Sequence, residues 1–381
     1  MSTTLADPAD LAARETAAPL ARASEAYLTW LRFRRHKLAM LGLVVVVLMY
    51  LVAAFAEFVA PFAPDKANAR LVYHPPQAIH WIDTASNGAW RFAPYVTPMR
   101  ITRDPVTLAA KFVPETSRRV YLGLFTRGDP YSFWGLWRAN VHLFGPVASR
   151  DVVFLLGADR LGRDMLSRII YGARASLSIG LVGVACSLAL GILLGGISGY
   201  FGGATDWFVQ RVIEYILSLP VIPIWLALAA ALPSDWGPMQ RYFCITLIIS
   251  LVGWTELARV VRGRFLALRS EIYVTSAWLD GCSQGRVIFR HMLPAMTSHI
   301  IASVTLAIPI MILAETSLSF LGLGLQPPAI SWGALLEDAQ SVEALSAAPW
   351  LLLPGAAVAL TVLALNFLGD GLRDAADPHA H

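Results

Sequence analysis

The chain has 381 residues, of which 56% are hydrophobic, and its formal net charge is +4. Soluble domains contain roughly 45–50% apolar residues, so this composition, with a mean hydropathy of +0.57, excludes an ordinary soluble protein. Several apolar runs are long enough to cross about 30 Å of hydrocarbon, and we predict an all-α protein embedded in the lipid bilayer. The small net charge says little about nucleic acid, and we expect no nucleic-acid partner. Three dispersed cysteines argue against a disulfide framework or a metal site.

The amino-terminal part, residues 1–37, is predicted to lie in the cytoplasm. Residues 1 to about 24 lack apolar periodicity, which predicts a disordered tail. A basic cluster then precedes an apolar run, 38–60, which we predict as the first transmembrane helix; the cluster is Arg32, Arg34, Arg35, His36 and Lys37. The alternative is a signal peptide, because residues 54–56 resemble a cleavage site, but the long leader and long run favour an uncleaved span.

Residues 61–165 differ from the rest of the chain. Prolines punctuate them, charges of both signs are mixed in, and no stretch is long and apolar enough to span a membrane. We predict a large periplasmic insertion between the first and second spans. Its aromatic residues, which include Trp81, Trp90, Trp134 and Trp137, form either a ligand surface or, as we favour, a small core with an interfacial belt.

Five further spans are predicted in the core, 166–371, at 175–196, 212–232, 242–261, 298–321 and 350–368. Six spans with a cytoplasmic start return the carboxyl-terminal tail, 372–381, to the cytoplasm. The same alternation places the loop 262–295 there, and its five arginines agree with that side.

Small residues and prolines mark features inside the spans. Gly191, Gly195 and Gly199 recur every four residues, which predicts close packing of one helix face. Prolines predict kinks in the third, fifth and sixth spans, and they are Pro220, Pro223, Pro309 and Pro354.

Three acidic residues lie in or near the spans. Glu214 and Glu256 are expected to pair locally with Arg211 and Arg259. Glu315 has no basic residue within one turn, so it either lines a pathway or orders the following turn, or else snorkels or bonds locally. The pathway or gating candidates are Pro309, Glu315, Ser317, Ser319, Gly322 and Gly324.

Motifs for enzyme chemistry are largely missing. The sequence has no Gly-x-x-x-x-Gly-Lys-Ser/Thr phosphate loop and no His-Glu-x-x-His, so we expect neither an ATPase site nor a metalloprotease. Residues 196–199, Gly-Ile-Ser-Gly, resemble the nucleophile motif of rhomboid proteases, with His299 as a base. So short a match in a glycine-rich chain is weak, and we predict that the chain is not an enzyme.

The polar stretch 270–294 decides between the remaining classes. A turn at Gly281–Ser283 divides it into two predicted helices, with Ser283 as a cap of the second. Gly281, nine residues and then His-Met-Leu-Pro resemble the permease signature of ATP-binding-cassette importers, Glu-Ala-Ala, three residues, Gly, nine residues, Ile-x-Leu-Pro. The triplet here is Thr275-Ser276-Ala277, so the acidic residue is lost.

Further blocks resemble the subfamily that imports peptides, nickel and opines. They run over residues 156–164, 171–174, 315–333 and 368–378, so the likeness covers about 152–378. The resemblance implies a bacterial inner-membrane permease subunit with no cofactor of its own. It also implies a second homologous permease subunit, two ATPase subunits that bind ATP and Mg, and a periplasmic substrate-binding protein.

The resemblance further implies that the loop docks on the ATPase, with Arg286 and Arg290 either paired to it or solvated. The implied docking residues are Thr275, Ser276, Ala277, Gly281, Arg286, Arg290, His291, Leu293 and Pro294. Peptides are the expected cargo, with opines, oligosaccharides and nickel as alternatives. A self-contained channel or ion-coupled carrier is the alternative of another class, but the sequence offers few intramembrane ion ligands.

Overall fold

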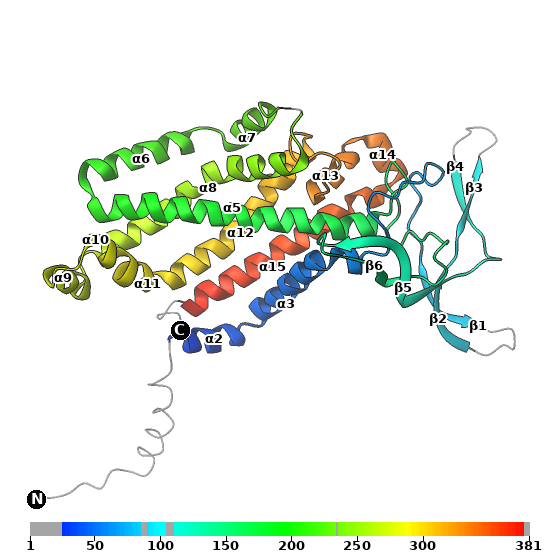
Figure 1. The fold of residues 1–381 in the computed structure, drawn as a ribbon, viewed down its shortest axis with the longest axis horizontal. Helices are drawn as coiled ribbons and strands as arrows, with labels where there is room; N and C mark the ends of the chain where they lie inside the picture. The colour runs from blue at the N-terminus through cyan, green and yellow to red at the C-terminus, as the bar shows by residue number, and fades with distance from the viewer. Residues whose placement is uncertain (1–24, 85–89, 104–109, 234, 377–381) are drawn as a thin grey trace, which may run out of the picture.

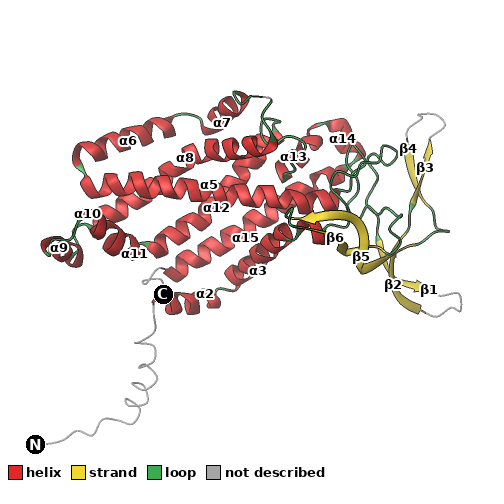
Figure 2. Cartoon of the chain, viewed as in Figure 1, coloured by secondary structure: helices red, strands yellow, loops and turns green. Residues whose placement is uncertain are grey.

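The computed structural model describes residues 25–84, 90–103, 110–233 and 235–376. A bundle of long helices fills most of the molecule, and all the described strands lie at one end of it (Figures 1 and 2). The tail expected at residues 1–24 lies outside the described residues.

Among the described residues, five helices are long and apolar enough to cross a membrane. They are α3 (Lys37–Ala54), α5 (Met165–Phe201), α8 (Pro238–Leu268), α12 (Thr297–Phe320) and α15 (Leu353–Ala376), the last with the 3₁₀ turn Pro349–Leu352 before it. The predicted third span is instead a broken pair, α6 (Gly203–Ser218) and α7 (Val221–Ala230), bent by 85°. Pro220 lies at the break, where it has no N–H to continue the hydrogen bonding of α6. Six spans result if this pair is one span.

Several element boundaries differ from the predicted ones. Helix α2 (Glu25–Arg35) lies within the predicted amino-terminal tail, and the short α4 (Ala56–Val59) follows a break at Phe55. Helix α15 continues past Leu372, where a tail was expected, and Pro309 lies inside an uninterrupted α12. Shorter helices complete the end of the bundle near the strands: α13 (Trp332–Glu337), the 3₁₀ turn Asp338–Gln340 and α14 (Val342–Ala347).

The first span packs one face on the bundle and leaves the other open. Gly42 lies against α15, because a Cβ there would be 2.5 Å from the carbonyl oxygen of Ala364. The opposite face of α3 is an exposed apolar stripe of Leu41, Val44, Leu48 and Leu51. An apolar face directed outward in this way suits contact with lipid acyl chains.

Helices α5 and α8 meet along the glycines of α5. A Cβ on Gly191 would lie 2.8 Å from Cβ of Leu257, and one on Gly199 would lie 2.8 Å from the carbonyl oxygen of Arg262. At Gly195 an added Cβ would collide with the backbone of Ala258. The two backbones therefore approach more closely than any larger residue at these positions allows.

The prediction of an all-α fold is wrong for the insertion. Strands β1 (Ile79–Thr84), β2 (Trp90–Val96), β5 (Val120–Phe133) and β6 (Trp137–Pro146) form an antiparallel sheet in the order β1-β2-β5-β6, and β3 (Met99–Arg103) pairs with β4 (Ala110–Pro114). The lack of a long apolar run excluded only a membrane span. The aromatic and β-branched residues of these segments favour strands, and Val96 and Val120 are buried in a small core of their own.

Arg174 is one of the residues that attach the strand-bearing end to the helices. Arg174 in α5 forms a bidentate ion pair with Glu57 of α4, at 2.8 and 2.6 Å, and also donates to the carbonyl oxygen of Ala53. Its guanidinium lies 4.2 Å from the centroid of the Trp134 ring, at the turn between β5 and β6. The Trp134 indole in turn donates to the carbonyl oxygen of Ala54. The β5–β6 hairpin is thus attached directly to the ends of α3 and α5.

Candidate functional site

The polar stretch that the sequence singled out forms a compact set of short helices at the end of the bundle away from the strands (Figure 1). They are α9 (Ile272–Leu279), α10 (Gln284–Arg286), a π-helical stretch (Val287–Met292) and α11 (Leu293–Ala295). We call residues 270–296 the docking segment. Gly281 has φ +76°, which glycine adopts without strain, and it ends α9. The predicted turn is therefore present, although Ser283 makes no capping hydrogen bond with its side chain.

The docking segment has its own small core, which it shares with the neighbouring long helices. The buried members are Val261, Phe265, Val274, Ala277, Val287, Met292 and Met296. They come from α8, from α9 and from the approach to α12. Any displacement of α9 must therefore act on the ends of α8 and α12, because close-packed side chains transmit strain.

The docking segment exposes both apolar and cationic side chains. Ile272 is 83% exposed, Leu279 74% and Phe289 68%. Arg286 and Arg290 are also exposed, and neither forms an ion pair within the described residues. Large apolar side chains gathered beside arginines are typical of a protein interface.

A polar network lies beside this segment, where α5, α6 and α8 end or begin. Arg262 of α8 binds Asp206 of α6 through two hydrogen bonds, at 2.5 and 2.6 Å. Asp206 also accepts from the buried hydroxyl of Ser198, which in turn accepts from Gln210 at 3.3 Å. His299 lies beside Arg264, 3.1 Å from it. The Ser198 hydroxyl is thus committed to a structural network, and the geometry gives the protease interpretation no support.

Glu315 lies inside the bundle, fully buried, and is held by hydroxyl groups. Ser319 donates to its Oε1 at 2.7 Å and Ser176 of α5 donates to its Oε2 at 3.2 Å. These two hydroxyls accept from the backbone N–H groups of Leu325 and Trp332, both at 3.0 Å. The carboxylate therefore organises the loop after α12 and joins it to α5. This agrees with the interpretation that Glu315 orders the turn that follows it.

The other pathway candidates surround this loop. Ser317 is exposed and donates to the carbonyl oxygen of Leu313 in its own helix. Gly322 has φ +77° at the helix end, and a Cβ on Gly324 would collide with Ser319. Pro309 is buried. These positions shape the loop from inside the bundle, and of this set only Ser317 presents an exposed polar side chain.

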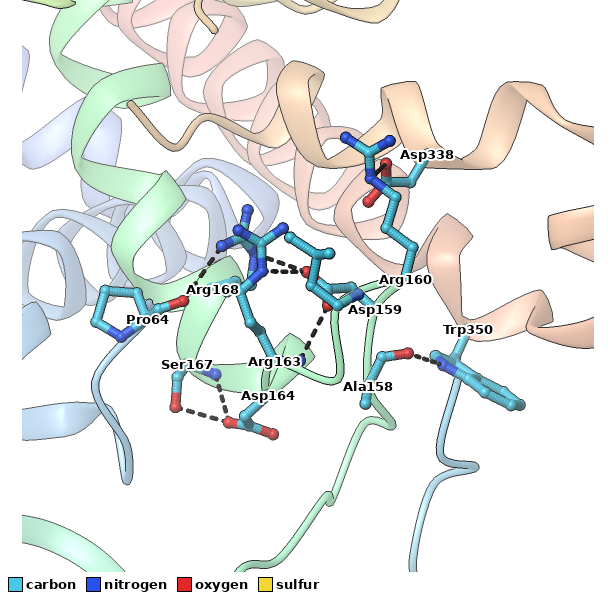
Figure 3. Close-up of polar contacts among 11 residues, drawn as sticks. Pro64, Ala158, Asp159, Arg160, Arg163, Asp164, Ser167, Arg168, Asp338 and Trp350 are labelled. Carbon is cyan, nitrogen blue, oxygen red and sulfur yellow. Dashed lines mark hydrogen bonds and ion pairs between the residues drawn. The ribbon is translucent and has the colours of Figure 1, made fainter. Parts of the chain in front are cut away.

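A second polar network joins the loop before α5 to distant segments (Figure 3). Asp159 is fully buried, accepts from Arg163 Nε at 2.7 Å, and pairs with Arg168 at 3.4 Å. Arg160 pairs with Asp338 at 2.9 Å, which ties this loop to the segment between α13 and α14. The indole of Trp350 donates to the carbonyl oxygen of Ala158 at 2.9 Å, so the start of the last span is also attached.

Asp164 is the amino-terminal cap of α5. Its Oδ2 accepts from the backbone N–H and the hydroxyl of Ser167, at 2.8 and 2.6 Å (Figure 3). Its Oδ1 is buried and has no hydrogen-bond partner in the described part of the chain. Burial outweighs the Ser167 hydrogen bonds and raises the pKa of Asp164 to about 6.

Comparison with known proteins decides the family. Residues 191–381 match the model of the binding-protein-dependent transport system inner membrane component, and residues 24–76 match the N-terminal TM domain of oligopeptide transport permease C. The oligopeptide transport system permease protein of Haemophilus influenzae is 40% identical over 223 residues, which are 58% of this chain and 69% of that protein. The chain belongs to the binding-protein-dependent inner-membrane permeases.

Two further relatives extend the likeness. The oligopeptide transport system permease protein of Bacillus subtilis is 29% identical over 91% of this chain and 88% of its own length. The dipeptide transport system permease protein of Alkalihalophilus pseudofirmus is 40% identical over 58% of this chain and 71% of its own length.

The permease carries all nine of its sequence-predicted docking residues on one continuous segment. Thr275, Ser276 and Pro294 are exposed on it, whereas Ala277 is buried in the small core, and His291 and Leu293 are half-buried. Thr275 donates to the carbonyl oxygen of Glu271 at 3.1 Å, so this position keeps a local role without the acidic side chain.

Sequence reasoning missed or misjudged other polar residues of the permease. The buried pair of Asp159 and Arg168 joins a loop to a helix, and no local spacing shows which charges will be buried together. Glu214 pairs with Arg211 at 2.6 Å, as predicted. The pair predicted between Glu256 and Arg259 is absent from the described ion pairs. Both of these side chains are exposed, and a helical spacing of three permits a pair without requiring it.

Proposed function

We propose that this permease forms half of a translocation pathway for peptides and couples it to ATP hydrolysis in separate ATPase subunits. The docking segment is the observation that carries the proposal. It presents exposed apolar and cationic side chains, and its core is shared with two membrane-spanning helices. Peptides are the proposed cargo because the similar proteins are oligopeptide and dipeptide transport permeases.

The membrane orientation that fits this function places the docking segment in the cytoplasm. The amino-terminal helix α2 and the end of α15 lie at the same end of the bundle (Figure 1), so both termini are proposed to be cytoplasmic. The basic residues of α2 support that side, because positive charges next to a span favour the cytoplasm. The strand-bearing insertion is then periplasmic, on the side where a binding protein delivers cargo.

The mechanism requires no bond chemistry in this chain. Closure of the ATPase subunits on ATP and Mg would push on α9, and the shared core would pass that movement to α8 and α12. A second permease subunit would complete the pathway. Arg286 and Arg290 are placed to pair with acidic residues of the ATPase, since they have no described ion-pair partner within the chain.

Co-purification with the ATPase subunits tests the docking role. A Cβ at Gly281 would have no atom within 4 Å, so the side chain of Gly281→Trp projects from an open position of the proposed contact, with the strain of a side chain at φ +76°. Gly135 is a matched control, because it has a similar φ, +74°, and equally open surroundings at the opposite end. We expect Gly281→Trp to insert in the membrane but to lose the ATPase, and Gly135→Trp to retain it. Equal co-purification of both variants would remove the docking role.

Reconstituted vesicles test the coupling. Peptide uptake should require the ATPase subunits and ATP. Uptake that continues after their removal would indicate a self-contained carrier instead.

A further inference from the structure

A cavity of about 360 Å³ lies between the broken pair α6–α7 and the helices α8 and α12. Apolar side chains make up most of its wall, among them Leu217, Val221, Ile249 and Met311. Binding sites for small ligands commonly have this size and lining, with a few polar groups that fix the orientation of the ligand. Three polar groups of this cavity are Glu256, Ser303 and the indole of Trp225.

Glu256 is an exposed carboxylate on a membrane-spanning helix. It lies twelve residues before the end of α8 at Leu268, which is about 18 Å along the helix axis. One turn before it, Gly253 packs against Met311 of α12. Ionisable groups at such depth face a water-filled cavity or a partner, because hydrocarbon solvates charge poorly. No ion pair of Glu256 occurs among the described residues, so the cavity holds an acceptor for a cationic group.

Trp225 supplies a donor to the same cavity. Its Nε1 atom is buried and has no hydrogen-bond partner among the described residues. Buried indole N–H groups normally have a partner, and one left without a partner is unfavourable. An oxygen of a bound ligand would satisfy it.

We propose that this cavity binds the amino-terminal end of the transported peptide. Glu256 pairs with the ammonium group, Trp225 donates to a carbonyl oxygen, and the apolar wall receives a hydrophobic side chain. This assignment rests on the proposed function, since it takes peptides as the cargo. A lipid chain in the cavity would leave the carboxylate in hydrocarbon, and an ion pair with another subunit would need no concave apolar site around it.

Peptide uptake by the complete reconstituted transporter tests the charge. A tripeptide with a free amino terminus and a leucine at its first position is the probe. Glu256→Gln removes one charge-assisted hydrogen bond, and we expect a loss of uptake of about tenfold. Glu256→Asp keeps the charge and should stay within about threefold of the wild type.

The matched control is Glu214→Gln, which makes the same chemical change outside the cavity, on α6. It should transport like the wild type, and all three variants should co-purify with the partner subunits. Wild-type uptake by Glu256→Gln overturns the proposal. Loss of the second permease subunit from that variant also overturns it, because the carboxylate then belongs to the subunit interface.

Labelling in the same complex tests whether the cavity contains water. Glu256→Cys is made in a background in which Cys186, Cys244 and Cys282 are replaced by serine, and it is treated with a water-soluble maleimide. We expect labelling about tenfold faster than at Leu251→Cys, an exposed position of α8 outside the cavity. Saturating tripeptide should slow the labelling of Glu256→Cys. Equal labelling rates at the two positions would overturn the proposal that the cavity is open to water. Rapid labelling of Glu256→Cys in a transporter that carries no tripeptide would overturn only the proposal that peptides are the cargo.

Discussion

The close contact between α5 and α8 predicts that alanine is less well tolerated at Gly195 than at the adjacent Gly196, which serves as the control. In Gly195→Ala, the new methyl group would lie 2.9 Å from Cα and 3.0 Å from the carbonyl carbon of Ala258. Carbon atoms pack best at about 3.5–4.0 Å, so the two backbones must move apart. In Gly196→Ala, the new methyl group would lie 3.5 Å from the Phe265 ring, an ordinary contact.

The two variants differ in unfolding free energy by the cost of overpacking, because the gain in helix propensity is the same for both. Alanine in place of glycine favours a helix by about 1 kcal/mol, and this gain is common to both. Overpacking costs about 1–3 kcal/mol and applies to Gly195→Ala alone. The unfolding free energy of Gly195→Ala should therefore lie about 1–3 kcal/mol below that of Gly196→Ala.

The assay is unfolding of the purified permease in detergent micelles, followed by helical circular dichroism as denaturing detergent is added. Each variant is compared with the wild type at the same protein and lipid content. Equal stability of the two variants would show that α5 and α8 do not approach as closely as described.

Three further outcomes follow from the polar contacts, each measured as thermal or detergent unfolding. Glu315→Leu leaves two buried hydroxyl donors without an acceptor and should lower the unfolding free energy by about 2–6 kcal/mol. Glu315→Gln keeps an acceptor and should lower it less. Equal losses of stability in the two variants would contradict the hydroxyl network. The raised pKa of Asp164, about 6 against an ordinary 3.8, makes its contribution to stability greatest below pH 3.8, and that contribution is lost as the pH rises through 6. Relative to Asp164→Asn, the wild type should lose up to about 3 kcal/mol across that window, and parallel pH profiles would argue against it. Arg174→Lys breaks the bidentate pair with Glu57 and should cost about 1–3 kcal/mol, whereas Arg127→Lys, at an exposed arginine of β5 without a described ion pair, should cost nothing measurable.

The sequence predicted the features that depend on residues close to one another in the chain. Span positions follow from the length of apolar runs, so each of the five long helices overlaps a predicted span, although their ends differ. The turn at Gly281 follows from glycine alone, and the pair of Arg211 and Glu214 follows from helical spacing. The docking segment was found because it is polar in a chain that is otherwise apolar.

The remaining features depend on contacts between distant segments. The strands of the insertion were missed because a test for membrane spans says nothing about pairing between strands. A proline marked the bend between α6 and α7, but the residue type does not predict how large the bend is, and it is 85°. Burial of Asp159 depends on arginines that are brought to it by the fold, and the unpaired state of Glu256 depends on which way each side chain turns from α8.

The small core of the docking segment connects α8 and α12, so that the two helices would move together. Because Val261 and Phe265 of α8 share that core with Met296, next to the start of α12, a push at α9 would act on both helices together. Helix α6 packs on α8 through a separate core that includes Val209 and Trp254, and the bend at Pro220 separates α7 from α6. The wall of the cavity that would move is therefore the α8–α12 side, and Glu256 of α8 would shift relative to Trp225 of α7. A ligand held between these two residues would be released by their separation, without any change in either residue's charge.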